Sequence, residues 1–124
     1  MSSYYEKFLA TGKVKCIDEE IPFEIPQGWE WCRMGCIGDW GAGATPAKGN
    51  SEYYGGNILW LRTGELNNGV VYDTEIKITE KALRECSLRL NKVGDVLIAM
   101  YGATIGKVAI AGNEMTSNQA CCAC

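Results

Sequence analysis

Short apolar segments separated by glycine make up most of the chain after residue 28. The segments cover residues 29–37, 39–40, 58–62, 70–72 and 75–79. In the last segment Ile76 and Ile78 alternate with Glu75 and Lys77, a period of two that is typical of a half-buried strand. The pattern therefore predicts a series of short strands.

A helix is predicted directly after Thr79. The Thr79 hydroxyl can cap free backbone amides, and Glu80 suits the positive end of a helix dipole. Ala82, Leu83 and Cys86 would then form the buried side of this helix.

The second half of the chain continues with a turn and a predicted hairpin. Residues 91–95 read as a turn, and strands are expected over residues 96–101 and 107–111, on either side of the glycine-rich turn 102–106. Many short strands with one or two short helices, and no regular alternation of the two, predict an α+β domain with a mixed, mostly antiparallel sheet arrangement.

The first 28 residues have a different character. Residues 4–10 predict a short helix that ends at Gly12, and residues 15–28, with an acidic run and two prolines, predict an exposed, extended linker. We therefore divide the chain into residues 1–28, an N-terminal helix and linker, and residues 29–124, the folded body.

Length and composition fit one soluble globular domain, since the chain has 124 residues, 47% of them hydrophobic and 22% charged. The most apolar stretch, residues 96–112, is interrupted by Lys107 and glycines, so we predict no membrane span. The N-terminus lacks the layout of a secretory signal, and a cytoplasmic protein is expected.

The charge is unfavourable for binding an anionic partner, because 12 basic and 15 acidic residues leave a net charge of -3. Three lysines and five acidic residues lie among the first 29 residues, which leaves nine basic and ten acidic residues in the remainder. The body is therefore close to neutral, and alone it should bind DNA weakly, since neutralisation of phosphates supplies most non-specific affinity.

The seven cysteines and the absence of histidine limit the chemistry. An odd number argues against a complete disulfide framework, and the spacing of the C-terminal cysteines makes a zinc site the less favoured interpretation. We expect small, buried, reduced cysteines, no metal site and no catalytic residue, because a histidine base is missing. A thiol enzyme with an activated cysteine is the last-ranked alternative.

Two glycine-rich stretches do not fit nucleotide-binding motifs. Pro46 stands where a dinucleotide fingerprint that starts at Gly41 needs a glycine. Between Gly102 and Gly106 there are three residues where a phosphate loop needs four. No nucleotide cofactor is therefore expected.

Polar side chains instead gather in the loops. Asn50, Asn118 and Gln119 could pair with adenine in a major groove, although such residues also simply form turns. Lys48, Arg62 and Lys107 could contact phosphates, although each could be an ordinary surface charge. The candidate DNA contacts are Thr45, Lys48, Asn50, Tyr54, Arg62, Thr63, Tyr101, Thr104 and Lys107.

An ordered set of short segments follows along the chain from residue 21. It begins with the entry segment at residues 21–31 and the GATP segment at residues 43–46. The segments that follow are residues 53–58, 60–66, 78–79, 94–97, 105–107 and 118–120. Each segment alone is a weak signal, but together they span about residues 21–124 and resemble, in their order, the specificity subunit of type I restriction-modification enzymes.

The resemblance implies a domain like the DNA methylase specificity domain that recognises double-stranded DNA and does no catalysis. The parent subunit would contain two such domains, each reading half of a split target. Methyltransferase and restriction subunits would be its partners and would hold S-adenosylmethionine, ATP and Mg. The alternative is an interaction or dimerisation module that does not read DNA by itself.

The family's domain continues beyond the segment at residues 118–120, so we expect residues 29–124 to be a partial target-recognition domain. Residues 120–124 are a run of small apolar side chains. If they formed a strand at an open edge, that edge would invite pairing with a second copy. The sequence therefore predicts a homo-oligomer, most simply a dimer.

Overall fold

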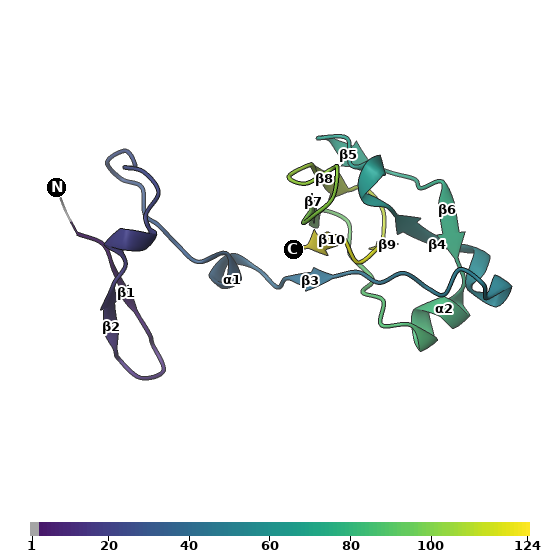
Figure 1. The fold of residues 1–124 in the computed structure, drawn as a ribbon, viewed down its shortest axis with the longest axis horizontal. Helices are drawn as coiled ribbons and strands as arrows, with labels where there is room; N and C mark the ends of the chain where they lie inside the picture. The colour runs from purple at the N-terminus through teal and green to yellow at the C-terminus, as the bar shows by residue number, and fades with distance from the viewer. Residues whose placement is uncertain (1–2) are drawn as a thin grey trace. The chain divides into compact units, whose positions relative to one another are not determined.

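The computed structural model describes residues 3–124 and divides into two compact units (Figure 1). The first unit ends at Arg33, and the second spans Met34–Cys124. The border falls a few residues after Trp29, where we expected the folded body to begin. Residues 29–37, one of the apolar segments, contain no strand but include the short helix α1 (Met34–Ile37).

The first unit is a hairpin followed by a 3-10 turn, and the helix expected over residues 4–10 is wrong. β1 (Tyr5–Lys7) pairs antiparallel with β2 (Val14–Cys16), and the turn η1 (Asp18–Glu20) follows within the expected linker. Gly12 adopts a φ of 72°, which lets the chain reverse direction between the strands. A helix this short is marginal without tertiary support, so pairing with β2 prevails.

Arg33 connects β1 and η1 of the first unit through ion pairs. Its guanidinium contacts both carboxylate oxygens of Glu6, at 2.8 and 2.9 Å, and also Glu20 at 2.6 Å. Hydrogen bonding from Arg33 lowers the pKa of Glu6, and bonds from Lys15 and Arg33 lower the pKa of Glu20. The acidic residues of the expected linker thus help to fold this unit.

The second unit contains two sheets, in agreement with the predicted α+β class. The larger sheet has the order β3-β10-β7-β8-β5, and the smaller has the order β6-β4-β9. Two pairings are parallel, β5 with β8 and β4 with β9, and the others are antiparallel. The elements are β3 (Gly41–Ala42), η2 (Ser51–Tyr53), β4 (Tyr54–Leu61), η3 (Thr63–Glu65), β5 (Val70–Val71), β6 (Ile76–Ile78), α2 (Glu80–Glu85), β7 (Val96–Ala99), β8 (Val108–Ala111), β9 (Met115–Ser117) and β10 (Cys121–Ala123).

Local signals in the sequence predicted several of these elements correctly. Thr79 caps α2, since its Oγ1 accepts a hydrogen bond from the Ala82 amide at 3.3 Å. Ala82 is fully buried, as expected, while Leu83 and Cys86 are half-buried. The expected strand at residues 75–79 is β6, and the expected hairpin is β7, a turn with two left-handed glycines, and β8.

Strand β4 separates two hydrophobic cores. Successive side chains of a strand point to opposite faces. Trp60 packs with Ile78 and Ala82, whereas Leu61 belongs to the larger cluster between the sheets. The larger cluster consists of Leu61, Leu66, Val71, Leu97, Ala99, Ala109, Ala111, Met115, Cys121 and Ala123.

The cysteines only partly match the expectation of buried thiols. Cys121 is fully buried, and burial raises the pKa of its thiol, whereas Cys16, Cys32 and Cys36 are exposed. All seven are free. Within residues 3–124, no cluster of three or more cysteines and acidic residues is arranged to hold a metal ion.

The expected open edge at the C-terminal strand is wrong. β10 lies inside the larger sheet, paired with β3 on one side and β7 on the other. Cys124 and Val96 exchange backbone hydrogen bonds of 2.8 and 2.9 Å, which extend the β10–β7 pairing. Small side chains suit this position because β10 is a central strand with one face in the core.

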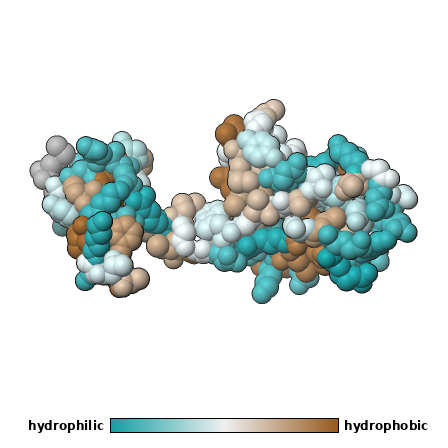
Figure 2. Space-filling view, turned by 60° about the horizontal axis from the view of Figure 1, so that its bottom comes forward, coloured by the Kyte–Doolittle hydropathy of each residue, from teal (hydrophilic) through white to brown (hydrophobic). Residues whose placement is uncertain are grey.

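The outer face of the larger sheet is apolar as well. Each position that points away from the core carries a hydrophobic side chain: Ala42, Val70, Val96, Ile98, Val108, Ile110 and Cys122. Ile110 is 44% exposed and Val96 is 42% exposed. Figure 2 shows hydrophobic residues at the surface of the second unit. No helix among the described residues is long and apolar enough to span a bilayer.

Close backbone packing requires glycine at position 43, which gives a first prediction. A Cβ at Gly43 would lie 2.5 Å from the Asn118 carbonyl oxygen and would also collide with Ser117. We expect Gly43→Ala to lower the free energy of unfolding by about 1–3 kcal/mol in urea titrations. Gly49→Ala is the control, because nothing lies within 4 Å of a Cβ there. Equal stability of the two variants would contradict this packing.

The outer sheet face gives a second prediction. Ile110→Lys should change the free energy of unfolding by about 1 kcal/mol or less, because this side chain is 44% exposed. The same change should reduce binding of a hydrophobic dye, since it interrupts the apolar surface. Ala111→Lys is the control, because Ala111 is 0% exposed and its substitution should unfold the domain. Tolerance of both substitutions would show that the faces are assigned wrongly.

Candidate nucleic-acid interface

A half-open pocket of about 480 Å³ lies in the second unit. Its walls come from the loop after β3, from β4 and β6, and from the loop between β9 and β10. The lining residues are Thr45, Lys48, Tyr54, Trp60, Arg62, Ile76, Asn118 and Gln119. The set combines aromatic rings, two cations and two amides, and it contains no acidic residue.

Trp60 and Tyr54 form rigid aromatic walls. Trp60 Nε1 donates to the Ala44 carbonyl at 3.0 Å, and the Tyr54 hydroxyl donates to the Pro46 carbonyl at 2.6 Å. The two rings meet edge to face, with centroids 6.4 Å apart. Burial raises the pKa of Tyr54, which keeps its hydroxyl protonated. The polar atoms of both rings are used within the fold, and because Trp60 is 4% exposed, the half-buried Tyr54 offers the pocket more apolar surface than Trp60 does.

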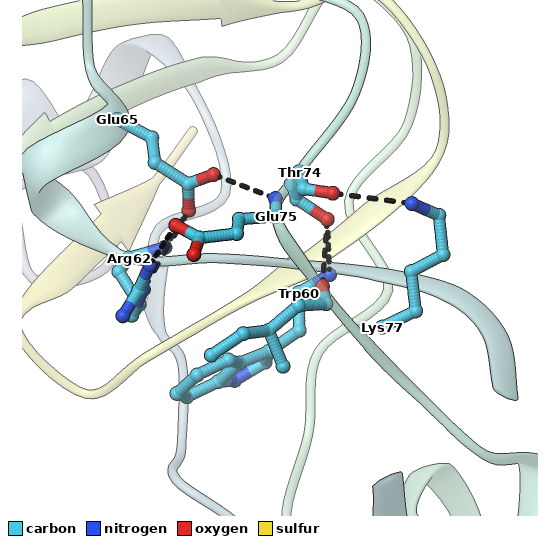
Figure 3. A network of polar contacts seen from close by, with 7 residues as sticks. Trp60, Arg62, Glu65, Thr74, Glu75 and Lys77 are labelled. Atoms are coloured by element: carbon cyan, nitrogen blue, oxygen red, sulfur yellow. Dashed lines mark hydrogen bonds and ion pairs between the residues drawn. The ribbon is translucent and has the colours of Figure 1, made fainter. Parts of the chain in front are cut away.

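Arg62 is held by carboxylates at the edge of the pocket (Figure 3). Its Nη2 lies 2.6 Å from Glu75 Oε2, and its Nε lies 4.0 Å from Glu65 Oε2. Glu65 also accepts hydrogen bonds from the backbone amides of Arg62 and Glu75, each 2.9 Å long. This network fixes the guanidinium and offsets part of its charge.

Lys48 differs from Arg62, because its side chain has no ion-pair partner within residues 3–124. Lys48 is exposed on the loop before η2. Of the cations that line the pocket, it is the one whose charge is available to a ligand.

The loop between β9 and β10 supplies the amides of the pocket. The Asn118 backbone amide donates to the Leu61 carbonyl at 2.9 Å, which fixes this loop against the end of β4. The Thr45 hydroxyl donates to Gln119 Oε1. Asn118 Oδ1 is buried and has no hydrogen-bond partner. The pocket therefore carries one unsatisfied polar atom.

Two other candidate residues lie outside the pocket lining. Asn50 caps η2, since its Oδ1 accepts from the Glu52 amide at 3.0 Å. This contact is the turn-forming role that we weighed against DNA contact. Thr63 is the first residue of η3, directly after Arg62.

The remaining candidates, Tyr101, Thr104 and Lys107, lie together in the turn between β7 and β8. Tyr101 is 51% exposed, and Lys107 is also exposed. A hydrogen bond of 2.8 Å from the Met100 amide to the Ala120 carbonyl joins this turn to the residue after Gln119. The loop at residues 118–120 thus connects the turn with the pocket.

The structure brings together four of the nine candidates, Thr45, Lys48, Tyr54 and Arg62, in one pocket. Sequence reasoning did not select Trp60 and Ile76, because a buried aromatic or aliphatic residue in a strand has the same pattern whether or not it borders a pocket. Asn118 and Gln119 were noted as polar loop residues, but only the fold shows that they face residues 45–62.

Comparison with known proteins identifies the family. Residues 26–124 match the family described as the type I restriction modification DNA specificity domain. The specificity subunit of the type I restriction enzyme MjaIX from Methanocaldococcus jannaschii is 41% identical over 99 residues, which is 77% of this chain and 23% of that protein. The specificity subunit of EcoR124I/EcoR124II from Escherichia coli is 31% identical over 80 residues, 64% of this chain and 20% of that protein.

A solved structure supports the fold assignment. A chain from a structural study of the type I R-M system aligns with a TM-score of 0.60 at 21% identity, covering 82% of this chain and 24% of that one. The chain thus spans about a quarter or less of the proteins that it matches. With a family match over residues 26–124 and an aligned fold, this chain belongs to the type I restriction modification DNA specificity domain family.

Proposed function

We propose that this chain is a DNA target-recognition domain of a type I restriction-modification specificity subunit, and that it reads one half of a split target in double-stranded DNA. The match of residues 26–124 to the specificity domain family carries the proposal. The pocket and the adjoining turn support it, because they gather exposed cations, amides and aromatic rings on loops that a rigid sheet holds.

The proposal assigns no catalysis to this chain. The methyltransferase and restriction subunits would be its partners and would hold S-adenosylmethionine, ATP and Mg. The site of action would be the cytoplasm, where the DNA of a prokaryotic cell lies. With β10 enclosed in the sheet, the C-terminal strand no longer supports a homo-oligomer, and any self-association would have to use another surface.

The candidate residues divide by the charge that they can offer to DNA. Lys48 and Lys107 are exposed cations without ion-pair partners among the described residues, so we propose them as phosphate contacts. Arg62 is oriented by Glu65 and Glu75 and suits a directed contact more than general attraction. Thr45, Asn50, Tyr54, Thr63, Tyr101 and Thr104 remain candidates for contacts with bases or the backbone.

A third prediction tests the phosphate contacts. Lys48→Ala and Lys107→Ala should each weaken the binding of all duplex sequences alike and lower the slope of log affinity against log salt by about 1. Fluorescence anisotropy over a series of salt concentrations that starts at about 50 mM is suited to the weak binding expected of a nearly neutral domain. Lys92→Ala is the control, since Lys92 is also exposed but lies on the turn before β7.

The same titrations separate recognition from the alternative function. If neither this chain nor a full-length specificity subunit containing it binds duplex DNA at low salt, while the subunit still associates with the methyltransferase subunits, the chain is an interaction module. Unchanged binding by both lysine variants would instead show that DNA contacts another surface of the protein.

A fourth prediction concerns the turn between β7 and β8. In a specificity subunit reconstituted with its partners, Tyr101→Ala combined with Thr104→Ala should reduce or change target choice without lowering thermal stability, because exposed loops can carry recognition on an intact scaffold. Methylation of a panel of duplexes measures target choice. Methylation of the original target at the original rate would exclude this turn from recognition.

A further inference from the structure

We propose that the pocket between β4 and the β9–β10 loop accepts a single nucleobase extruded from the DNA helix, with the Asn118 amide pairing with its edge. This inference rests on the proposed function, because it names the part of the DNA that the pocket would take. Three features of the pocket carry it: the shape of its aromatic walls, the state of the Asn118 amide, and its charge.

The walls suit a flat, aromatic ligand. Trp60 and Tyr54 have their polar atoms bonded to the carbonyls of Ala44 and Pro46, so both rings are held in place before any ligand enters. The half-buried Tyr54 offers ring surface for packing, which every base can use, whereas Trp60 is 4% exposed and supports Tyr54 edge to face. The volume of about 480 Å³ is in the range of sites that enclose small organic molecules.

The Asn118 amide is the polar group that lacks a partner. A buried oxygen without a hydrogen bond costs free energy, and a ligand that brings a donor would recover it. The terminal torsion of an asparagine is soft, so the amide can turn to present this oxygen to the pocket while the backbone stays bonded to Leu61. An amide offers an acceptor beside a donor, which matches the adjacent donor and acceptor on the pairing edge of an unpaired base.

The charge of the pocket suits the phosphates that accompany an extruded base. Lys48 and Arg62 line the pocket, and no acidic residue does. Lys48 is free to contact a phosphate, while Arg62 is fixed by Glu75 at 2.6 Å. A base within an intact duplex is stacked between its neighbours, so a base that enters the pocket must leave the stack.

The experiment uses duplexes that differ at one position. Extrusion costs less when a base has no complement. Anisotropy titrations would therefore compare a paired adenine, an adenine opposite an abasic site, and an abasic site on both strands. We expect the duplex with the unpaired adenine to bind at least about tenfold more tightly than either of the others.

Two substitutions of Asn118 then test the role of the amide. Asn118→Leu should remove the preference for the unpaired base, whereas Asn57→Leu, at an exposed position of β4, should keep it. Asn118→Asp should shift the preference towards an unpaired guanine, because a carboxylate only accepts and guanine presents two adjacent donors. A shifted preference is a gain that a damaged fold would not produce, and circular dichroism melting checks the fold of each variant.

The outcomes separate this inference from the proposed function. Duplex binding that depends on Lys48 and Lys107 but not on an unpaired base would support DNA recognition and overturn the base pocket. A preference for the unpaired base that survives both Asn118 substitutions would also overturn it. No binding to paired duplexes, together with Asn118-dependent binding to single strands that carry a base but not to abasic ones, would support the pocket and contradict duplex recognition.

Discussion

The second unit depends on β4, an eight-residue strand whose neighbouring side chains enter two different cores. Leu61 anchors the strand in the larger core, and Trp60 anchors it in the smaller one. The end of β4 also receives the hydrogen bond from Asn118 that fixes the β9–β10 loop. The pocket exists because these contacts meet at the same strand end, so its geometry is set by packing on both sides of β4.

Local chemistry made part of the fold predictable. The Thr79 cap, the alternation of Ile76 and Ile78, and the glycine turn between β7 and β8 are each encoded within a few residues, and each was found as expected. The hairpin of the first unit was missed because β1 is held by pairing with β2, a partner that lies outside residues 4–10. No pattern within residues 4–10 reports that partner.

The site was predictable in composition but not in arrangement. Loop residues at 45–54 and 118–119 were recognised as polar candidates, yet their meeting depends on the parallel pairing of β4 with β9. Similarly, residues 120–124 were correctly seen as small and apolar, but the sequence does not report that β3 lies on the far side of β10. Both misjudgements concern which distant strands become neighbours, and that information is non-local.

Part of the acidic charge behind the net value of -3 has a structural role in the folded chain. Several carboxylates are engaged inside the protein: Glu65 accepts from two backbone amides, Asp39 lies 3.2 Å from Arg89, and Asp95 accepts from the Lys92 amide at 2.9 Å. These carboxylates stabilise the fold through contacts with nearby backbone amides and cations. The pocket lining itself carries Lys48 and Arg62 and no acidic residue, while Glu65 and Glu75 beside it offset part of the Arg62 charge.

The order of strands in the larger sheet has a consequence for synthesis of the protein. β3 pairs with β10, which joins residues 41–42 to residues 122–123, and β10 in turn separates β3 from β7. Contacts so distant along the chain carry a large loop-closure cost and form slowly. A nascent chain on the ribosome would therefore keep β3 and its apolar neighbours unpaired until the last of these strands emerged.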